Sequence, residues 1–391
     1  MYWCQIIEND HYHNKEFIET ILDKHRDILH LSKNDIADFS FDQLKGGSNV
    51  NFKITFSNKS KIFFKHNPKP IESTIYGDTL QREYKILTHL YNESRLTPKP
   101  YIYDCSENVL ITEFVDGRTP NMHDKDFFKT LTLLGNSLNS FRTTPIQLLQ
   151  EFNTGTRLCP RNFFEKVLNP SIAKYTKKLL LEGSTNLFQF LEEITGIMTD
   201  KLKYEPKSDC NANFSAYLEN PKNSPHGLIH NDMALRNIII TNDPNRPICF
   251  IDWEFADFGD IAYDLAYLQS ENQLLTQQIE VISKLGHLSS YVHERSLRYI
   301  RIYLPMLELI NCYWTIDHIS QMISPEESQE GKKLKLRSPY TLSENLDFIN
   351  NKIKRLVRLS KIDGSRKQNE IELLNEIQVA LKLFERQLVI E

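Results

Sequence analysis

Carboxylate and amide side chains lie beside two short apolar runs of this sequence. Asp232 and Asn237 come just before and at the start of "NIII", and Asp252 directly follows "ICFI". Oxygen ligands of these types suit Mg²⁺, which binds oxygens at about 2.0–2.1 Å and is usually completed by waters and phosphates. The three residues therefore predict a magnesium-dependent reaction if the fold brings their side chains together.

A hairpin is the local structure that would bring them together. The turn "TNDPNRP" separates residues 237–240 from 248–251, which predicts two antiparallel strands. Paired positions in such a ladder lie about 4.5–5.5 Å apart. Asn237 and Asp252 should then leave the hairpin side by side. Asp232, on the preceding loop, can close over the same point.

The triplet Asp-Phe-Gly at 257–259 is spelled like the metal-binding triplet of a protein kinase. Asp257 lies five residues after Asp252, up to about 17 Å away in an extended chain, and so beyond the reach of Asn237. We therefore predict that Asp252, and not Asp257, is the metal ligand. Asp260 and Asp264 flank the start of a helix, and we interpret them as a helix cap or a loop brace.

The elements that must position these residues change in kind along the chain. Hydrophobic spacing and turn residues predict, in order, a helix over 14–30, strands over 39–44, 49–56 and 61–66, a helix over 78–92, and strands over 101–105 and 108–115. Residues 1–115 are thus expected to form a small lobe with a five-stranded sheet and a helix. Apart from the hairpin, residues 116–391 are predicted to form a mainly helical lobe that ends in a basic helical tail over 325–391.

Motifs in the central segment carry a family resemblance. "HNDMALRN" followed by "FIDWE" fits the pattern His-x-Asp-x-x-x-x-Asn and Asp used for phosphoryl transfer in kinase-like folds. With "GDIAYDLA" close behind, the segment resembles the aminoglycoside phosphotransferase/choline kinase superfamily, and particularly bacterial choline-, ethanolamine- and thiamine-kinase-like enzymes. The resemblance is strong over 226–268, weaker over 46–115 and faint in the tail. It implies an α+β, protein-kinase-like two-lobed fold and the cofactors ATP and Mg²⁺.

The resemblance also assigns roles within the catalytic segment. Asp232 would accept the proton of the attacking hydroxyl or orient that hydroxyl. Asn237 and Asp252 would hold Mg²⁺, and His230 would brace the loop through hydrogen bonds. Positioning and charge neutralisation supply most of the catalysis in such reactions, because phosphoryl transfer has a loose transition state.

The amino-terminal lobe is expected to clamp the nucleotide. The loop formed by Gly46, Gly47, Ser48 and Asn49 could lay backbone amides over phosphates, although two glycines at this point could equally make a plain hairpin turn. The resemblance places the backbone of Glu113 through Val115 against adenine, at the hinge between the lobes.

Lys65 ends the third predicted strand, where the family has its phosphate-binding lysine. An ion pair with Glu83, on the next helix, would aim the ammonium at the α- and β-phosphates. The alternatives are that Lys65 is one of several solvated lysines, and that Glu72 or Glu93 is the partner.

The acceptor is expected to be a small cationic alcohol. Between Asp252 and Asp264 the sequence has five acidic residues and no basic one, which would attract a cation, although the metal and the helix start can also account for these charges. Glu254 is the expected acidic contact. Trp314 and Asp317 are further candidates, because an aromatic ring with a nearby carboxylate can hold a quaternary ammonium. They share a helix face with Tyr303, Leu307 and Ile310, so core packing is the competing interpretation.

Composition excludes several other classes. The chain has 391 residues, 40% hydrophobic and 25% charged, with a net charge of −4, and gives no global sign of nucleic-acid or membrane binding. It shows neither a membrane-spanning run nor a signal peptide, and its six cysteines are scattered. We therefore expect reduced thiols and a cytoplasmic location; the oligomeric state stays open.

Rival functions remain at this point. An aminoglycoside-type antibiotic phosphotransferase would need an open, acid-lined cleft. A protein kinase would need an activation segment longer than "FADFGD". A catalytically silent nucleotide-binding scaffold could dock an anionic partner through residues 331–367, which carry eleven Lys or Arg against three Asp or Glu. A solvated helix face is the simpler interpretation of that basic stretch.

Overall fold

The computed structural model describes most of both lobes. The described residues are 11–44, 49–67, 78–142, 155–171, 195–196, 199, 202, 217, 219–220, 223–286, 289–323, 347–349, 351–356 and 358. Gly46, Gly47 and Ser48 of the expected phosphate loop, and most of the tail, lie outside them.

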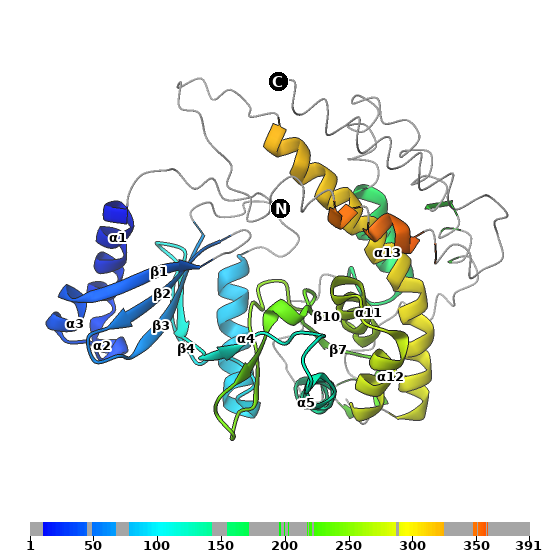
Figure 1. Cartoon of the computed structure of the whole chain (residues 1–391), viewed down its shortest axis with the longest axis horizontal. Helices are drawn as coiled ribbons and strands as arrows, with labels where there is room; N and C mark the ends of the chain where they lie inside the picture. Colours follow the sequence, from blue (N-terminus) through cyan, green and yellow to red (C-terminus); the bar gives the residue numbers. More distant parts are fainter. Residues whose placement is uncertain are drawn as a thin grey trace.

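The amino-terminal lobe is an antiparallel five-stranded sheet with one helix against it. Its strands are β1 (Phe39–Leu44), β2 (Val50–Phe56), β3 (Lys61–His66), β4 (Pro100–Asp104) and β5 (Val109–Glu113), in the spatial order β1-β2-β3-β5-β4. The helix α4 (Thr79–Ser94) lies between the third and fourth strands in the sequence and beside the second lobe in space (Figure 1). Asp78 caps it by accepting a hydrogen bond from Gln81 N–H. The predicted order of three strands, a helix and two strands is confirmed.

Three helices precede the sheet. They are α1 (His11–Lys24), α2 (Arg26–Leu29) and α3 (Lys33–Ala37). Ile18, Ile21 and Leu22 of α1 are buried and pack with apolar residues of the sheet. The single helix expected over 14–30 is interrupted at His25, and α3 was not predicted.

Asp104, the last residue of β4, holds this helical layer to the sheet. Its carboxylate lies 2.6 Å from Lys24 Nζ and 2.7 Å from His25 Nε2, and it accepts a hydrogen bond of 2.7 Å from Ser106 Oγ. Burial would raise the pKa of Asp104, but the hydrogen bonds from Lys24, His25 and Ser106 outweigh it and hold the pKa well below the usual range.

We expect Asp104→Asn to lower the free energy of unfolding at pH 7 by about 1–3 kcal/mol, because charge-assisted hydrogen bonds are lost. The depressed pKa means that this stabilisation is present above the unfolded-state pKa of about 3.9 and disappears as the pH falls below it. Urea unfolding at a series of pH values measures the difference. Asp42→Asn, at an exposed ion pair with Lys53, is the control and should cost about 0–1 kcal/mol. A gap for Asp104→Asn that stays constant down to pH 3 would contradict the assignment.

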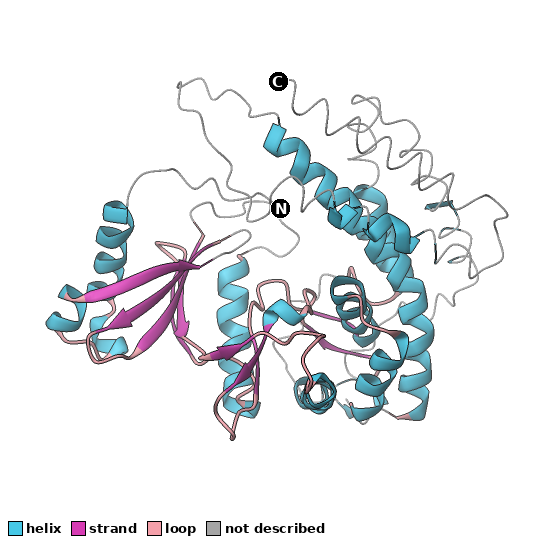
Figure 2. Cartoon of the chain, in the orientation of Figure 1, coloured by secondary structure: helices cyan, strands magenta, loops and turns pink. Residues whose placement is uncertain are grey.

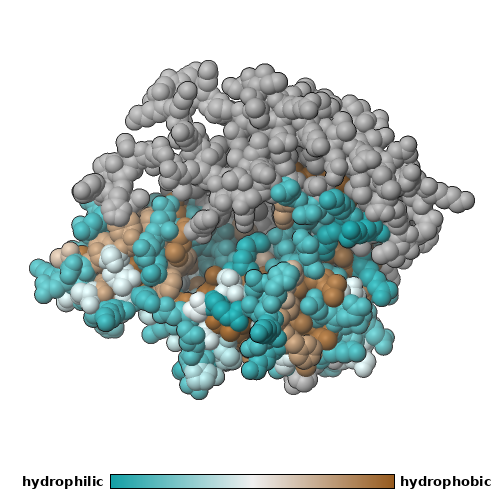
Figure 3. Space-filling model, viewed as in Figure 1, coloured by the Kyte–Doolittle hydropathy of each residue, from teal (hydrophilic) through white to brown (hydrophobic). Residues whose placement is uncertain are grey.

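The carboxy-terminal lobe is mainly helical, as predicted, and its helices gather on the side opposite the large sheet (Figure 2). The elements are α5 (Phe127–Arg142), α7 (Pro160–Phe163), the π-helical turn η1 (Phe164–Leu168), α11 (Ile261–Asn272), α12 (Thr276–Leu285) and α13 (Ser290–Ile323). One large core joins α4 to these helices. On the face seen in Figure 3, hydrophilic and hydrophobic residues are mixed over both lobes.

Two small sheets flank the predicted catalytic and metal-binding residues. The predicted hairpin is present as β8 (Ile238–Thr241) and β9 (Ile248–Phe250), with Ile238 opposite Phe250, and β6 (Gly117–Arg118) joins its outer edge. A second pair, β7 (His226–Ile229) with β10 (Asp257–Asp260), was not predicted. All eight of its residues are buried, so the alternation that identifies a strand in sequence is absent.

Two further expectations concern the whole chain. Among the described residues, none of the helices is both long and apolar enough to cross a membrane. Cys105, Cys249 and Cys312 are free thiols, but Cys159 is disulfide-bonded. The expectation of reduced thiols is therefore wrong at Cys159, because sequence spacing does not show which cysteines meet in space.

Candidate active site

The loop between β7 and β8 brings Asp232 and Asn237 together. A short 3-10 turn, η4 (Leu235–Asn237), reverses the chain so that Asn237 Nδ2 donates to the Asp232 carboxylate at 2.8 Å and to its backbone carbonyl at 2.9 Å. Asn231, just before Asp232, has a left-handed φ of 70°, a conformation that asparagine adopts more readily than most residues. The predicted proximity of these two residues is present in the structure.

His230 and Asp264 hold this loop in place through hydrogen bonds. The Asp264 carboxylate accepts hydrogen bonds from the backbone N–H groups of His230 (2.7 Å) and Asn231 (2.9 Å). His230 Nε2 lies 2.9 Å from the carbonyl oxygen of Ile251, and its ring lies 4.6 Å from that of Trp253. Burial lowers the pKa of His230, which favours the neutral ring. These contacts hold the backbone of the loop, and the role of His230 as its brace stays a prediction.

Asp260 has the other structural role that was foreseen. Its side chain accepts a hydrogen bond from Ala262 N–H and caps α11. Arg295, from α13, approaches the same carboxylate at 3.1 Å. Both groups are buried, so Asp260 joins the start of α11 to α13 rather than facing a ligand.

Arg236 is a functional candidate that the sequence analysis missed. Its Nη2 lies 2.7 Å from Asp232 Oδ1, so the carboxylate is held by Arg236 on one oxygen and by Asn237 on the other. Burial raises the pKa of Asp232, and Arg236 acts in the opposite direction. The i,i+4 spacing of Asp232 and Arg236 was a signal, but one turn of helical spacing was not expected in a loop.

Lys65, on β3, lies at the centre of three carboxylates. Its Nζ is 2.7 Å from Glu83 Oε2, 2.6 Å from Asp252 Oδ1 and 3.1 Å from Glu254 Oε2. The predicted ion pair with Glu83 is therefore present. The other oxygen of Glu83 accepts a hydrogen bond of 3.1 Å from Trp253 N–H, so α4 is tied to the second lobe at this point.

The charges of this cluster depend on one another. Burial acts to lower the pKa of Lys65, but the carboxylates of Asp252, Glu254 and Glu83 together raise it well above its usual value. Burial acts to raise the pKa of Asp252, yet the Lys65 ammonium holds it below the ordinary range. Ligand oxygens of Glu83, Asp252 and Glu254 lie within 4.8 Å of one another, and the ammonium among them explains why three acids gather there.

Asp252 is the member of the cluster that is open to a ligand. Its side chain is 38% exposed, against 5% for those of Glu83 and Glu254. Ile251 N–H donates to the carbonyl oxygen of Asn237 at 3.0 Å, which extends the hairpin ladder to the residue before Asp252. The carboxylate of Asp252 and the amide of Asn237 are thus oxygen-bearing groups at neighbouring strand ends, a donor set that fits Mg²⁺.

The two other acids of this segment point elsewhere. Asp257 is fully buried in β10, where it pairs with Ile229, and its carboxylate accepts from Phe258 N–H. Glu254 was expected on an extended strand, facing a cationic substrate. That local geometry is wrong, because Asp252 has a left-handed φ of 67° and the chain turns at 254–255. The Glu254 side chain instead accepts a hydrogen bond of 2.7 Å from Asn49 Nδ2.

The hinge residues connect the lobes. Glu113 N–H donates to the carbonyl oxygen of Lys99. The Glu113 carboxylate accepts two hydrogen bonds from the Arg246 guanidinium, at 2.8 and 2.6 Å. Arg246 belongs to the β8–β9 turn, so this bidentate pair fastens the end of β5 to the second lobe. Val115 is buried at the hinge.

The structure describes only some of the side chains on the α13 face that was predicted to contact the substrate or pack in the core. Tyr303, Leu307 and Ile310 are fully buried, which agrees with the packing interpretation for these three. Trp314 and Asp317 lie in α13, but their side chains are outside the described set, so their substrate role stays a prediction.

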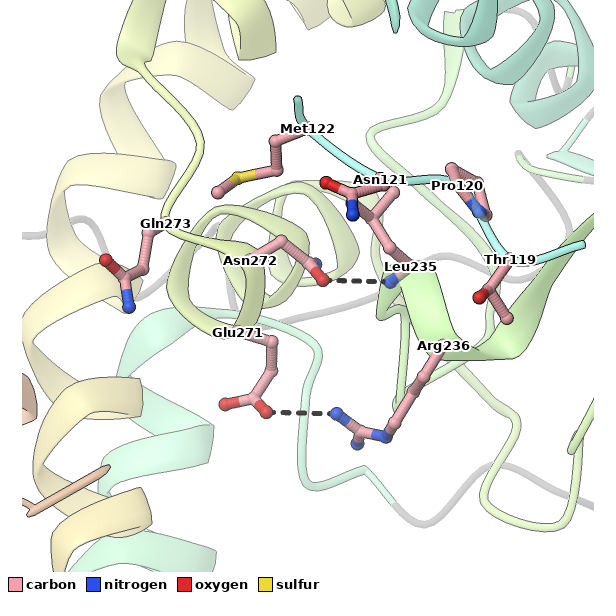
Figure 4. A pocket seen from close by; sticks show the side chains of 9 residues that line it. All are labelled: Thr119, Pro120, Asn121, Met122, Leu235, Arg236, Glu271, Asn272 and Gln273. Carbon is pink, nitrogen blue, oxygen red and sulfur yellow. Dashed lines mark hydrogen bonds and ion pairs between the residues drawn. The ribbon is translucent and has the colours of Figure 1, made fainter. Parts of the chain in front are cut away.

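A pocket of about 380 Å³ opens beside the loop between β7 and β8, the candidate catalytic loop (Figure 4). The chain after the hinge forms one side of it, and Leu235, Arg236 and the end of α11 form the other. Arg236 and Glu271 pair across its floor at 3.1 Å, and Asn272 accepts from Leu235 N–H. The lining residues are Thr119, Pro120, Asn121, Met122, Leu235, Arg236, Glu271, Asn272 and Gln273.

The two-lobed α+β arrangement, with a lysine–glutamate pair facing a loop of this kind, is that of protein-kinase-like phosphotransferases. The phosphotransferase enzyme family matches residues 43–291, about two thirds of the sequence, and the chain belongs to that family. The resemblance proposed from the sequence is confirmed.

Known relatives agree with this assignment. The chain is 26% identical to the protein LicA homolog of Metamycoplasma hominis over 261 residues, which are 62% of this chain and 84% of that protein. It has the fold of the ethanolamine kinase Pv091845 of Plasmodium vivax (TM-score 0.56, 19% identity, 92% of this chain and 91% of that one). It also has the fold of the choline kinase LicA of Streptococcus pneumoniae (TM-score 0.53, 19% identity, 88% and 98%).

Proposed function

We propose that this phosphotransferase moves the γ-phosphate of ATP to the hydroxyl of a small cationic amino alcohol of the choline, ethanolamine or thiamine kind. The observation that carries the proposal is the contact between Lys65 and Asp252. It brings a buried ammonium, held by Glu83, to the exposed carboxylate at the hairpin end, next to the loop of Asp232 and Asn237.

Residues of the chain divide the work between the two lobes. The lobe over 1–115 would bind the nucleotide, with Lys65 at the α- and β-phosphates, Asn49 and the preceding loop over them, and the Glu113–Val115 backbone at adenine. LicA, a neighbour of the same fold, has been solved in complex with AMP, which supports nucleotide binding by a protein of this fold. The lobe over 116–391 would supply the acceptor site and the reacting groups.

Asp232 would orient the acceptor hydroxyl and take its proton. Its two oxygens are held by Arg236 and Asn237, so the carboxylate is positioned before the acceptor arrives. Burial raises the pKa of Asp232, and a more basic carboxylate is better suited to accept a proton. Asn237 and Asp252 would hold Mg²⁺, which when bound neutralises charge on the transferred phosphoryl group.

Two observations support the proposed class of acceptor. The neighbours in fold are named as ethanolamine and choline kinases. The pocket beside Arg236 has the size of a small-molecule site and contains the Glu271 carboxylate and several amides, groups that can bind an amino alcohol. Glu254 is buried against Lys65, whereas Glu271 lines the pocket and shares its charge with Arg236 and Lys352.

The test is ADP release from Mg-ATP with a panel of choline, ethanolamine, thiamine, amino sugars and aminoglycosides. Turnover with one amino alcohol, confirmed by mass spectrometry of the phosphorylated product, would establish the function and name the acceptor. Turnover with aminoglycosides alone would replace the amino alcohol by an antibiotic. ATP binding without turnover on any acceptor would favour the alternative that the protein is a catalytically silent nucleotide-binding scaffold.

A further inference from the structure

Residues 351–356 belong to the basic stretch 331–367 and lie beyond the region matched by the family, yet they are packed into the second lobe. Ile353 and Leu356 are buried in the same core as α11 and α13, together with Ile349. In Figure 1 this helical segment (orange) lies against α13. The packing puts its basic side chains over the end of α11, the helix that borders the catalytic loop.

Lys352 is the most enclosed of these basic residues, with a side chain only 4% exposed. Its Nζ donates to Ser270 Oγ at 2.9 Å and to the Ser270 carbonyl oxygen at 3.0 Å. The same ammonium lies 3.1 Å from Glu271 Oε1 and 3.3 Å from Glu308 Oε2. Arg355 adds a second cation, 3.0 Å from Glu308 and bonded to carbonyl oxygens of the last turn of α11.

Glu271 extends this cluster to the catalytic loop. One of its oxygens faces Lys352 and accepts from Asn311 Nδ2 at 2.7 Å, and the other lies 3.1 Å from Arg236 Nη1. Arg236 in turn contacts Asp232 at 2.7 Å. A continuous chain of ion pairs therefore runs from the carboxy-terminal segment to the candidate base.

We propose that Lys352 is a positioning residue for phosphoryl transfer: by fixing Glu271 it sets Arg236, and through Arg236 the carboxylate of Asp232. The proposal rests on the function proposed above for Asp232. Glu271 is 10% exposed and is paired with both cations, so its orientation responds to the loss of either. A carboxylate displaced by a fraction of an ångström loses alignment with the attacking hydroxyl, and displacement of about 1 Å can cost about 100-fold in rate.

The variants are Lys352→Met, which keeps the length of the stem, Lys352→Arg, which keeps the charge, and Glu271→Gln, which keeps the shape but weakens both links. Lys354→Met, the same change at a partly exposed lysine of the same helix, is the matched control. Each full-length variant is checked for folding by circular dichroism. Its kcat for choline phosphorylation is then expressed per site that binds Mg-ADP, and its KM for Mg-ATP is measured.

We expect Lys352→Met and Glu271→Gln to lower kcat per site by about 10- to 100-fold with the KM for Mg-ATP within about twofold of wild type. Lys352→Arg should recover most of the rate, and Lys354→Met should match wild type. A Lys352 that only stabilises the lobe would reduce the number of binding sites and leave kcat per site unchanged. That result, or wild-type kcat in folded Glu271→Gln, would overturn the proposal.

A thermal double-mutant cycle tests the coupling without turnover. Lys352→Met and Arg236→Met are combined, and the losses in Tm of the two single variants are compared with that of the double variant. A loss in the double variant smaller than the sum supports one connected network, whereas additive losses refute it. If wild type phosphorylates no acceptor, the proposed function fails, and this cycle still decides whether Lys352 and Arg236 are coupled.

Discussion

Asp232→Asn should reduce kcat for phosphoryl transfer by about 10²–10⁴-fold, the range expected when a positioned general base is lost. The amide has nearly the shape of the carboxylate and still accepts from Asn237, but it does not take the proton of the acceptor hydroxyl. It also loses the ion pair with Arg236 at 2.7 Å, so the orientation of the side chain is weakened as well. The measurement is steady-state ADP release with the acceptor identified in the panel.

Nucleotide binding should survive this substitution, because the proposed function assigns Asp232 to the acceptor hydroxyl and not to the nucleotide. We expect the Kd for Mg-ADP to change by less than about threefold, measured by calorimetry. Asp243→Asn, the same change at an exposed residue of the β8–β9 turn, should retain wild-type kcat. If Asp232→Asn keeps more than a tenth of the wild-type rate, Asp232 is not the base.

Lys65→Met should affect both stability and activity. Removal of the ammonium leaves Glu83, Asp252 and Glu254 with oxygens within 4.8 Å of one another and without their central cation. Breaking a buried ion pair from one side typically costs about 3–5 kcal/mol. Loss of a preorganised charge at the phosphates is expected to lower kcat/KM for ATP by about 10²–10³-fold.

The stability loss should depend on pH in a definite direction. Without Lys65 the crowded carboxylates acquire pKa values above those of the unfolded chain, so the folded variant binds more protons than the unfolded one. Its stability relative to wild type should therefore improve as the pH falls from 8 to 6, which urea unfolding at both values measures. Lys61→Met, on the same strand and paired with the exposed Asp116, should cost about 0–1 kcal/mol at either pH. A gap that stays constant between pH 8 and pH 6 would contradict this account, because it would mean that removal of Lys65 leaves the number of protons bound by the carboxylates unchanged.

Most acidic residues of the segment from Asp252 to Asp264 make contacts within the protein. Five acids between Asp252 and Asp264 suggested an attraction for a cationic substrate. In the structure Asp257 lies inside β10, Asp260 caps a helix, Asp264 holds the loop, and Glu254 faces Lys65. Most of that charge is therefore used within the protein. The proposed preference for a cationic acceptor therefore draws little support from these acids, and Glu271, the acid among the residues that line the pocket, is itself paired with Arg236 and Lys352.

Local spacing in the sequence was sufficient for much of the framework. The hairpin at 237–251 follows from two apolar runs around one turn, and its ladder ends with Ile251 opposite Asn237, which leaves Asp252 one residue farther along the chain. The order of strands and helix over 39–113 follows from periodicities within short windows. The interruption at His25 and the pairing of β7 with β10 were missed, since four buried residues in a row carry no period and a helix break can depend on a partner such as Asp104.

Only the tertiary structure decided which charged groups meet. Glu83 and Trp253 are 170 positions apart, and Lys65 and Asp252 are 187 positions apart, yet each pair is in contact. The left-handed backbone of Asp252 turned Glu254 toward Lys65, and the packing of residues 351–356 brought Lys352 to Glu271. The sequence by itself determined which residue types were present and which short elements they formed. It could not determine these contacts, because the energy of an ion pair depends on distance and burial in space, and neither quantity is encoded by separation along the chain.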